Sequence, residues 1–323
     1  VPNPILGWRV GWSREVMSGQ RSDAKAIPMI VRGGEHNNNG AWFHSRHLWV
    51  QNEDTAHLPN LVDRRSFEEL LQGSIPLPKS PKESAKAIQL LPGYKVELMA
   101  SEPLVLDPVA FEWDKEGRLW VAEMADYPLG LDNKGKAGGR IRILEDQNND
   151  GRYDHSTVFL DSLPYPSGVM PWRDGALISA APDILFAKDK NDDGKADEVR
   201  VLFTGFGQGN QQHRMNGFEY GLDNWIYGAN GDSGGTIKSE KNNIPVNIRG
   251  RDFRFRPKTL EFQTQAGQTQ FGRRRDDWGN WFGNSNYSLG WHYKYPEQYI
   301  RRNDKLIISN NRQHIGNYDR SHI

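Results

Sequence analysis

The sequence predicts an all-β protein of the β-propeller type, and three observations carry this prediction. A pattern of strand, loop and strand that begins at Ile143 returns 43 residues later at Phe186, and each copy leads into a further strand. Repeats of about 40–50 residues with several short strands are typical of propeller blades, because one four-stranded blade cannot bury both faces alone. The 33 Gly and 18 Pro indicate many turns, and the 11 Trp, 11 Tyr and 13 Phe can supply the buried area of a core. A β-sandwich of repeated hairpins is the alternative.

The N-terminal part differs in composition from the rest. Residues 1–62 are irregular, residues 63–91 contain short helices and a linker, and residues 92–323 form the predicted propeller domain, with a Pro-Gly turn at its start. The irregular segment holds four histidines that are a weak candidate metal site: His36, His44, His47 and His57.

Two short helices are predicted between residues 63 and 91. Ser66 stands three residues before Glu69, and Ser80 stands three before Glu83, so each pair has the spacing of a capping box. In the second pair Pro81 occupies the first helical position, where its missing N–H costs nothing.

Short strands follow. Alternation over residues 94–99 predicts a strand, and residues 111–123 predict a hairpin that turns at Gly117. Residues 218–228 repeat that hairpin, and residues 169–179 are a weaker copy. The length from 94 to 323 gives about five repeats of 43 residues.

Composition and charge exclude several classes of function. Lys+Arg and Asp+Glu both number 41, so no excess positive field holds nucleic acid or an anionic membrane. The absence of cysteine excludes disulfides, thiolate nucleophiles, Fe–S clusters and Cys-ligated zinc. No apolar run approaches the ~18–20 residues of a membrane span, so we expect no transmembrane segment. The chain starts at Val1, which indicates a removed leader or a piece of a longer protein.

Two acidic loops share the spacing Asp-x-Asn-x-Asp-Gly-x-x-Asp. Side-chain oxygens at the first, third and fifth positions converge, glycine allows a sharp turn, and the seventh position offers a carbonyl, which together suit Ca²⁺. We expect structural calcium on Asp146, Asn148, Asp150, Arg152 and Asp154 in the first loop and on Asp189, Asn191, Asp193, Lys195 and Asp197 in the second. Ordinary hairpin turns are the alternative.

Polar residues gather around the hairpin at residues 218–228. His213 comes just before its first strand, and a Gly- and Asp-rich loop with Asp232 follows its second. This order places both groups at one end of a blade, facing the central channel. A histidine there suits general-base catalysis because its ordinary pKa lies near neutrality. A merely hydrogen-bonded structural histidine is the alternative.

A second cluster contains three successive arginines, residues 273–275, followed by two tryptophans. Trp278 and Trp281 are expected to be buried. The arginines could hold an anionic carboxylate. Alternatively, they form a salt-bridged junction between blades.

Several of these segments resemble one family. Residues 94–104, 117–128, 213–232, 272–280 and 290–293 are similar to the membrane-bound dehydrogenase domain family, over roughly residues 78–303. That family is related to the soluble glucose/sorbosone dehydrogenases, which are quinoproteins on a six-bladed β-propeller. The resemblance therefore implies a ring of the six-bladed type, and because the residues after 94 are few for six blades, we expect the ring to be incomplete.

The resemblance implies a dehydrogenase that oxidises a sugar or related alcohol, with hydride transfer to pyrroloquinoline quinone (PQQ). His213 would be the catalytic base, and calcium would polarise the quinone. The cofactor would be lined by Arg214, Asn216, Asp232, Arg274 and Arg275. An exported protein, periplasmic or at the cell surface, and an electron-acceptor protein such as a cytochrome are further expectations. The alternatives are a non-catalytic propeller that binds carbohydrate or protein and a calcium-dependent lactonase.

Overall fold

The computed structural model describes residues 8–9, 31–32, 79–303, 305, 308 and 310–316. The chain divides into two compact units, Val1–Gln89 and Leu90–Ile323, and each is considered by itself. Most of the predicted segments 1–62 and 63–91, including the helix near Ser66 and the four histidines, lies outside the described residues.

In the first unit, β1 (Trp8–Arg9) pairs antiparallel with β2 (Val31–Arg32). Helix α4 (Pro81–Ala87) begins where the sequence predicts. The Glu83 amide donates to Ser80 Oγ at 3.3 Å, and the Ser80 amide donates to Glu83 Oε2 at 3.0 Å, which confirms the capping box.

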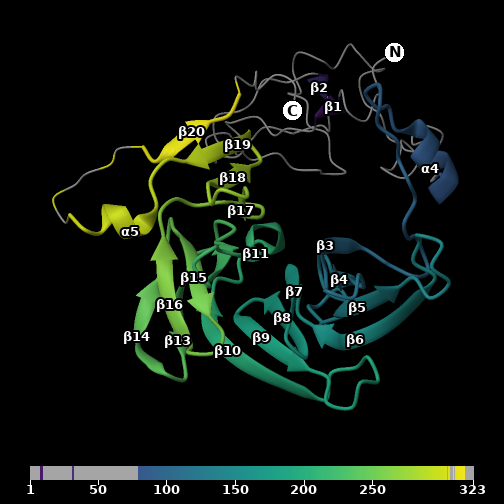
Figure 1. The fold of residues 1–323 in the computed structure, drawn as a ribbon, viewed down its shortest axis with the longest axis horizontal. Helices are drawn as coiled ribbons and strands as arrows, with labels where there is room; N and C mark the ends of the chain where they lie inside the picture. Colours follow the sequence, from purple (N-terminus) through teal and green to yellow (C-terminus); the bar gives the residue numbers. More distant parts are fainter. Residues whose placement is uncertain are drawn as a thin grey trace, which may run out of the picture. The chain divides into compact units, whose positions relative to one another are not determined.

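The second unit consists of four-stranded antiparallel meanders in chain order, four of them among the described residues (Figure 1). Blade 1 contains β3 (Pro108–Trp113), β4 (Leu119–Glu123), β5 (Gly139–Glu145) and β6 (His155–Leu163). Blade 2 contains β7 (Gly168–Trp172), β8 (Gly175–Ala180), β9 (Asp183–Lys188) and β10 (Glu198–Phe206). Blade 3 contains β11 (Asn216–Tyr220), β12 (Ile226–Ala229), β15 (Asp252–Arg256) and β16 (Glu261–Gln265). Blade 4 contains β17 (Arg274–Arg275), β18 (Trp281–Ser285), β19 (Ser288–Tyr293) and β20 (Arg312–His314), with α5 (Glu297–Ile300) between the last two strands.

The first strands of successive blades lie next to one another, β3 beside β7, β7 beside β11 and β11 beside β17. This arrangement is the all-β propeller type that the sequence predicts. The described residues contain four blades, so the six-bladed ring stays a prediction.

The core lies between facing blades. One cluster joins blades 1 and 2 around Trp120 and Ile178, a second joins blades 2 and 3 around Phe203 and Phe255, and an aromatic cluster around Trp281 joins blades 3 and 4. Every residue of β8 is buried, because this strand has a neighbouring blade on each face. Stacking of blades therefore covers the sheet faces that no single meander can bury.

The predicted hairpins are confirmed, whereas the predicted strand at residues 94–99 is wrong. Phe111 pairs with Val121 across the turn that contains Gly117, and the copies at β7–β8 and β11–β12 pair in the same manner. Tyr94 and Val96 are exposed, and residues 94–99 form no ladder. A strand needs an adjacent strand to pair with, and in the described part of the chain no strand pairs with residues 94–99.

One hairpin breaks the simple blade order. Strands β13 (Gly235–Ser239) and β14 (Asn242–Asn247) leave blade 3 after β12, and β13 pairs with β10 at the outer edge of blade 2. This pairing joins blades 2 and 3 through backbone hydrogen bonds, and Ile237 on β13 is buried in the core between these two blades.

Candidate functional site

A cavity of about 1050 Å³ lies where the first strands of the four blades meet. Its wall comes from β3, from the starts of β7 and β11, and from the segment that leads into β17. Aromatic side chains Phe111, Trp113, Tyr127 and Phe271 line it together with charged Asp107, Glu112, Arg214 and Arg274. A large cavity with apolar walls and a few polar groups is the usual form of a small-molecule site.

His213 and Asp232 meet beside this cavity, as their positions in the sequence predict. His213 ends the short 3₁₀ helix η2 (Gln211–His213), and Asp232 follows β12. His213 Nδ1 lies 3.4 Å from Asp232 Oδ2, and both side chains are roughly one-third exposed. His213 itself is not among the residues that line the cavity, although its neighbours Gln212 and Arg214 are.

Gln270 contacts the ring nitrogen of this histidine that faces away from Asp232. The Asn286 amide donates to Gln270 Oε1 at 2.9 Å, which turns the Gln270 amide nitrogen towards His213 Nε2, 3.3 Å away. An N–H that points at Nε2 matches the tautomer whose proton is on Nδ1, facing Asp232. Sequence reasoning missed Gln270 because it lies 57 residues from His213.

The backbone holds both members of the pair in place. Ser233 donates to the His213 carbonyl through its amide at 3.1 Å and through its hydroxyl at 2.6 Å. Gly231 and Asp232 both have positive φ, 71° and 78°, and a Cβ on Gly231 would collide with the carbonyl of Arg214. Aspartate in this conformation is strained, and such strain is common where a side chain is held for function.

Arg214 is a predicted cofactor residue that lines the cavity and has two buried nitrogens without a partner among the described residues. Its side chain is buried, its Nη2 donates to the Gln208 carbonyl at 2.9 Å, and its guanidinium carbon lies 4.7 Å from the centre of the Tyr165 ring. Nε and Nη1 have no partner among the described residues. Burial lowers the pKa of Arg214 below its ordinary value.

The other predicted cofactor residues have their polar groups engaged within the protein. Asn216 donates to the Arg214 and Gln270 carbonyls and accepts from the Gly272 amide at 2.6 Å, so it joins blade 3 to the segment before β17. Asp232 accepts from Gln268 Nε2 at 2.5 Å, in addition to facing His213.

Arg274 and Arg275 also have partners. Arg274 lines the cavity and pairs with Glu219 at 2.5 Å and with Glu112 of blade 1 at 3.4 Å. Arg275 donates from Nε to the Tyr220 carbonyl and does not line the cavity.

The first arginine of the run, Arg273, forms a buried junction between blades 3 and 4. Its Nη1 pairs with Asp252 Oδ2 at 3.0 Å, and its guanidinium lies against the rings of Tyr293 and Trp281. The salt-bridged interpretation of the arginine run is thus correct for this residue. Trp281 is buried as predicted, but Trp278 is 83 % exposed, because it lies at the tip of the β17–β18 turn, which Asp276 organises.

The two acidic loops connect β5 to β6 and β9 to β10, the equivalent position in blades 1 and 2. In both, the first aspartate accepts from the glycine amide at 2.8 Å, and the aspartate at the fifth position accepts from the amide of Arg152 or Lys195. Across the described part of the chain, no group of three or more His, Cys, Asp or Glu side chains is arranged to hold a metal ion. Calcium binding stays a prediction.

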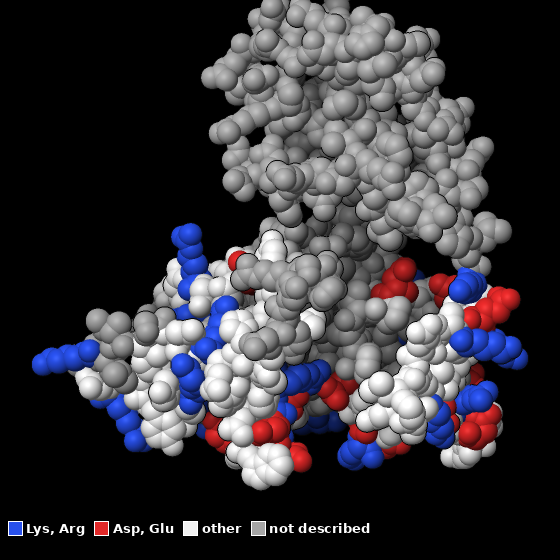
Figure 2. All heavy atoms as spheres, turned by 90° about the horizontal axis from the view of Figure 1, so that it is seen from above, with Lys and Arg blue, Asp and Glu red and all other residues white. Residues whose placement is uncertain are grey.

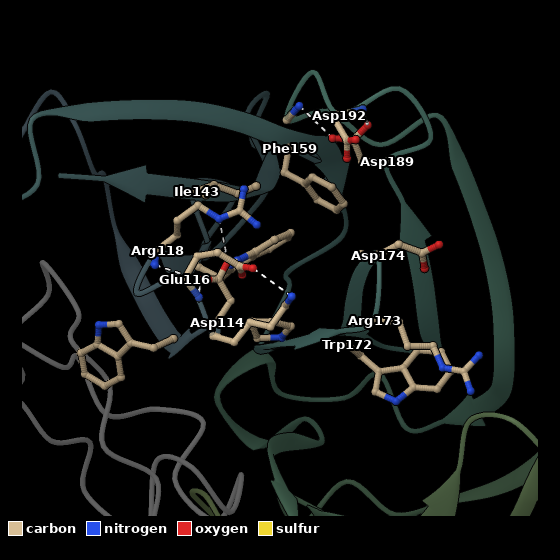
Figure 3. A pocket seen from close by; sticks show the side chains of 16 residues that line it. Asp114, Glu116, Arg118, Ile143, Phe159, Trp172, Arg173, Asp174, Asp189 and Asp192 are labelled. Atoms are coloured by element: carbon tan, nitrogen blue, oxygen red, sulfur yellow. Dashed lines mark hydrogen bonds and ion pairs between the residues drawn. The ribbon is translucent and has the colours of Figure 1, made fainter. Parts of the chain in front are cut away.

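A second cavity of about 470 Å³ lies at the turn end of blades 1 and 2 (Figure 3). Asp189 and Asp192 of the second acidic loop border it, opposite the β3–β4 turn. Within that turn, Asp114 accepts hydrogen bonds from Arg118 Nε at 2.7 Å and Trp120 Nε1 at 2.8 Å, and these bonds contribute to the low pKa of its carboxyl. Because the Asp114 carboxylate already accepts hydrogen bonds within the turn, this cavity offers fewer unpaired polar groups to a ligand than the central one.

Charges on the described surface are mixed. Lys and Arg alternate with Asp and Glu over the face in Figure 2, which agrees with the neutral sequence. In the part of the chain that the structure describes, no helix is both long enough and apolar enough to cross a membrane.

The fold and the site define a β-propeller with a central cavity and an adjacent His–Asp pair. Residues 80–322 match a family described as a domain of unknown function (DUF7133), and the chain belongs to this family. Among solved structures it is similar to a candidate 6-phosphogluconolactonase from Bacteroides uniformis, with a TM-score of 0.34 and 10 % identity over 60 % of this chain and 69 % of that chain. No curated protein matches the sequence.

Proposed function

We propose that the protein acts on a sugar or related alcohol in the central cavity, as a quinoprotein-like dehydrogenase with His213 as the general base. The observation that carries this proposal is the His213–Asp232 pair beside the cavity. A carboxylate on one ring nitrogen and a lone pair on the other is the arrangement that a general base needs.

Each group has a separate task in this proposal. Asp232 accepts a hydrogen bond from Nδ1–H, keeps the ring in one tautomer and stabilises the imidazolium that forms when Nε2 takes a proton. The Gln270 amide occupies Nε2 through a long contact of 3.3 Å, and a substrate hydroxyl would replace it. His213 then takes the hydroxyl proton on Nε2, and oxidation of the alcohol carbon would need a two-electron acceptor supplied to the protein.

PQQ is the quinone that the sequence resemblance implies, and its carboxylates require several cationic or N–H donors. Of the five residues expected to line it, Arg214 has two buried nitrogens without a partner among the described residues, whereas Asn216, Arg274 and Arg275 are engaged with protein groups. These residues do not form a donor set for PQQ, so we derive no step through it. The quinone remains part of the proposal as a co-substrate to be supplied.

A non-catalytic carbohydrate-binding propeller is the second candidate, and the cavity wall favours it. Phe111 and Trp113 stack edge to face at 5.3 Å and are both about half exposed. Exposed aromatic faces of this kind can pack against the apolar faces of sugar rings.

Dye-linked oxidation over a panel of sugars and alcohols, with added PQQ and Ca²⁺, tests the proposal. We expect turnover in the wild type and a loss of about 10²-fold or more in His213→Gln. His155→Gln, which changes an exposed histidine of β6, is the matched control and should keep full activity. Absence of turnover with every substrate, or equal turnover in His213→Gln, would refute the catalytic proposal, and sugar binding without turnover would favour the second candidate.

Export to the periplasm or cell surface and electron transfer to a cytochrome-like protein belong to the same proposal. Both are supported by the sequence resemblance alone. Cell fractionation with an antibody against the chain tests the first, and cytochrome reduction by the working enzyme tests the second.

A further inference from the structure

A short segment between blades 3 and 4, residues 268–270, contacts both members of the His213–Asp232 pair. Gln268 Nε2 donates to Asp232 Oδ1 at 2.5 Å, and Gln270 Nε2 lies 3.3 Å from His213 Nε2. His213 Nδ1 lies 3.4 Å from the other carboxylate oxygen of Asp232, Oδ2. The four side chains therefore form a row in which each glutamine contacts one end of the pair.

The neighbours of the two glutamines decide which end of each side-chain amide faces the pair. A carboxylate only accepts hydrogen bonds, so Gln268 presents its NH₂ group to Asp232. The Asn286 backbone amide donates to Gln270 Oε1 at 2.9 Å, so the NH₂ group of Gln270 faces His213. A donor therefore lies next to Nε2 of His213, and an acceptor lies next to its Nδ1.

Thr269 lies between the two glutamines and is bonded into the buried junction of blades 3 and 4. Its amide and its hydroxyl donate to Asp252 at 2.9 and 2.6 Å, and both residues are buried. The Thr269 carbonyl accepts from the Gly231 amide at 3.0 Å, directly beside Asp232 in the chain. Because Thr269 is held through its backbone and its side chain, the backbone of the glutamine on each side of it is also fixed in place.

Further hydrogen bonds hold the backbone of both glutamines. Arg312 of β20 donates from Nη2 to the Gln268 carbonyl at 2.7 Å. The Gln270 amide donates to the Asn284 carbonyl of β18 at 3.0 Å, and Asn216 donates from Nδ2 to the Gln270 carbonyl at 2.7 Å. Gln270 is also only 3 % exposed. A buried side chain on a fixed backbone keeps one orientation, and such a side chain can hold a neighbouring imidazole in one orientation as well.

We propose that Gln268 and Gln270 are positioning residues of the His213–Asp232 pair, and that they hold the neutral imidazole in the tautomer with its proton on Nδ1. Gln270 stabilises the lone pair on Nε2, and Gln268 occupies Oδ1 of Asp232, so that Oδ2 remains for Nδ1–H. This inference rests on the proposed function in one respect, that a lone pair on Nε2 is what a general base requires. The tautomer exists with or without turnover, so it can be measured without a substrate.

¹⁵N NMR of the full chain with labelled histidine measures the tautomer directly. The spectrum is recorded at about pH 9, where a histidine ring of ordinary pKa is neutral. The signals that are lost in His213→Gln are those of His213. We expect the wild-type ring to carry its proton mainly on Nδ1 and a lone pair on Nε2. A His213 ring that carries a proton mainly on Nε2 would overturn the inference.

Three variants test the two glutamines separately. Gln270→Glu keeps an acceptor for the Asn286 amide but places an acceptor beside Nε2, so Nε2 should become protonated. Gln268→Leu releases one oxygen of Asp232, so the tautomers should mix and part of the His213 signal should move to the Nε2–H form. Gln208→Leu, at an exposed glutamine in the loop before His213, is the matched control and should leave the tautomer unchanged. An unprotonated Nε2 in Gln270→Glu, or a wild-type tautomer in Gln268→Leu, would overturn the role of the residue that was changed.

The positioning role and the catalytic proposal fail separately in these measurements. If the dye-linked assay detects turnover, Gln268→Leu should lower kcat by about 10-fold with little change in KM, which is a part of the roughly 10²- to 10⁴-fold that general-base catalysis contributes. An unchanged kcat in this variant would overturn the positioning role of Gln268 and leave the catalytic proposal standing. If no substrate is turned over, the catalytic proposal is refuted, and the tautomers of the wild type and the variants still decide the role of the two glutamines.

Discussion

Replacing Arg273 with leucine removes the cation from the buried junction between blades 3 and 4. Asp252, on β15, then keeps hydrogen bonds from the Asn230 amide at 3.0 Å and from the amide and hydroxyl of Thr269 at 2.9 and 2.6 Å. It loses the charge partner at 3.0 Å, and the rings of Tyr293 and Trp281 lose the guanidinium between them. The change is therefore the loss of one ionic partner from a closed site.

The expected loss of folding free energy follows from the burial of the Arg273–Asp252 pair. Removing one member of a buried ion pair typically costs about 3–5 kcal/mol, because a carboxylate is left in an apolar surrounding. The retained hydrogen bonds and the added leucine methyl groups lower this figure, and the lost stacking raises it, so we expect about 4 kcal/mol. Arg274→Leu is the matched control: its side chain is half exposed, and such pairs are worth about 0–1 kcal/mol.

The pH dependence gives a second readout. Burial raises the pKa of Asp252 above its ordinary value, against the opposing effects of Arg273 and the Thr269 hydrogen bonds. A raised folded pKa means that the folded state binds more protons than the unfolded state above about pH 3.9, so stability from this group falls as pH rises. Loss of Arg273 raises the folded pKa further. The loss of folding free energy in Arg273→Leu should therefore become smaller as the pH is lowered, because protonation of Asp252 removes the unpaired charge.

Equilibrium urea unfolding at neutral and mildly acidic pH, followed by tryptophan fluorescence, measures both effects. Trp281 lies against Arg273 and reports on the junction. A loss below about 1 kcal/mol, equal to that of Arg274→Leu, would show that the pair contributes nothing specific. A deficit that grows on acidification would refute the assignment of the cost to the Asp252 carboxylate.

Three further changes have definite expected outcomes. Gly217→Ala should lower the free energy of unfolding in urea by at least about 2 kcal/mol, because φ is +61° and a Cβ would strike the backbone before β17. Gly117→Ala, at φ +82° in open space, is the control and should lower it by about 1 kcal/mol. Equal losses in the two variants would contradict the clash. Asn230→Ala should cost about 2–4 kcal/mol, because its buried amide group bonds three backbone groups, and a loss under about 1 kcal/mol in the same assay would refute this. If the acidic loops bind calcium, adding chelator should lower the midpoint of thermal unfolding. Asp146→Asn and Asp189→Asn should each remove one bound ion, counted by elemental mass spectrometry. A calcium-free protein that chelator does not affect would show that the loops are ordinary turns.

The local features of the chain were predictable because their causes are local. The predicted hairpins and the predicted start of α4 are confirmed. Their causes lie within a few residues of each element: Gly117 permits the turn of the first hairpin, and Ser80 caps α4. The repeat of 43 residues also indicated stacked blades, since each meander leaves two faces to be covered. The predicted strand at residues 94–99 is wrong, because an alternating side-chain pattern does not show that a neighbouring strand is present.

The choice of partners was decided by the tertiary structure. Arg273, Arg274 and Arg275 are adjacent and chemically identical, yet one is buried on Asp252, one pairs at the cavity wall and one bonds a carbonyl. Trp278 is exposed and the β13–β14 hairpin pairs with blade 2, which no local pattern indicated.

The sequence by itself determined the fold class, the hairpins with their turns and the approach of His213 to Asp232 around one hairpin. The tertiary structure decided which buried charges are paired and that Gln270 contacts Nε2 of His213. The physical reason is how far along the chain the interacting groups are separated. Backbone conformation is governed by neighbours along the chain, whereas the partners of a side chain come from distant segments: Asp252 lies 21 residues from Arg273, and Gln270 lies 57 residues from His213.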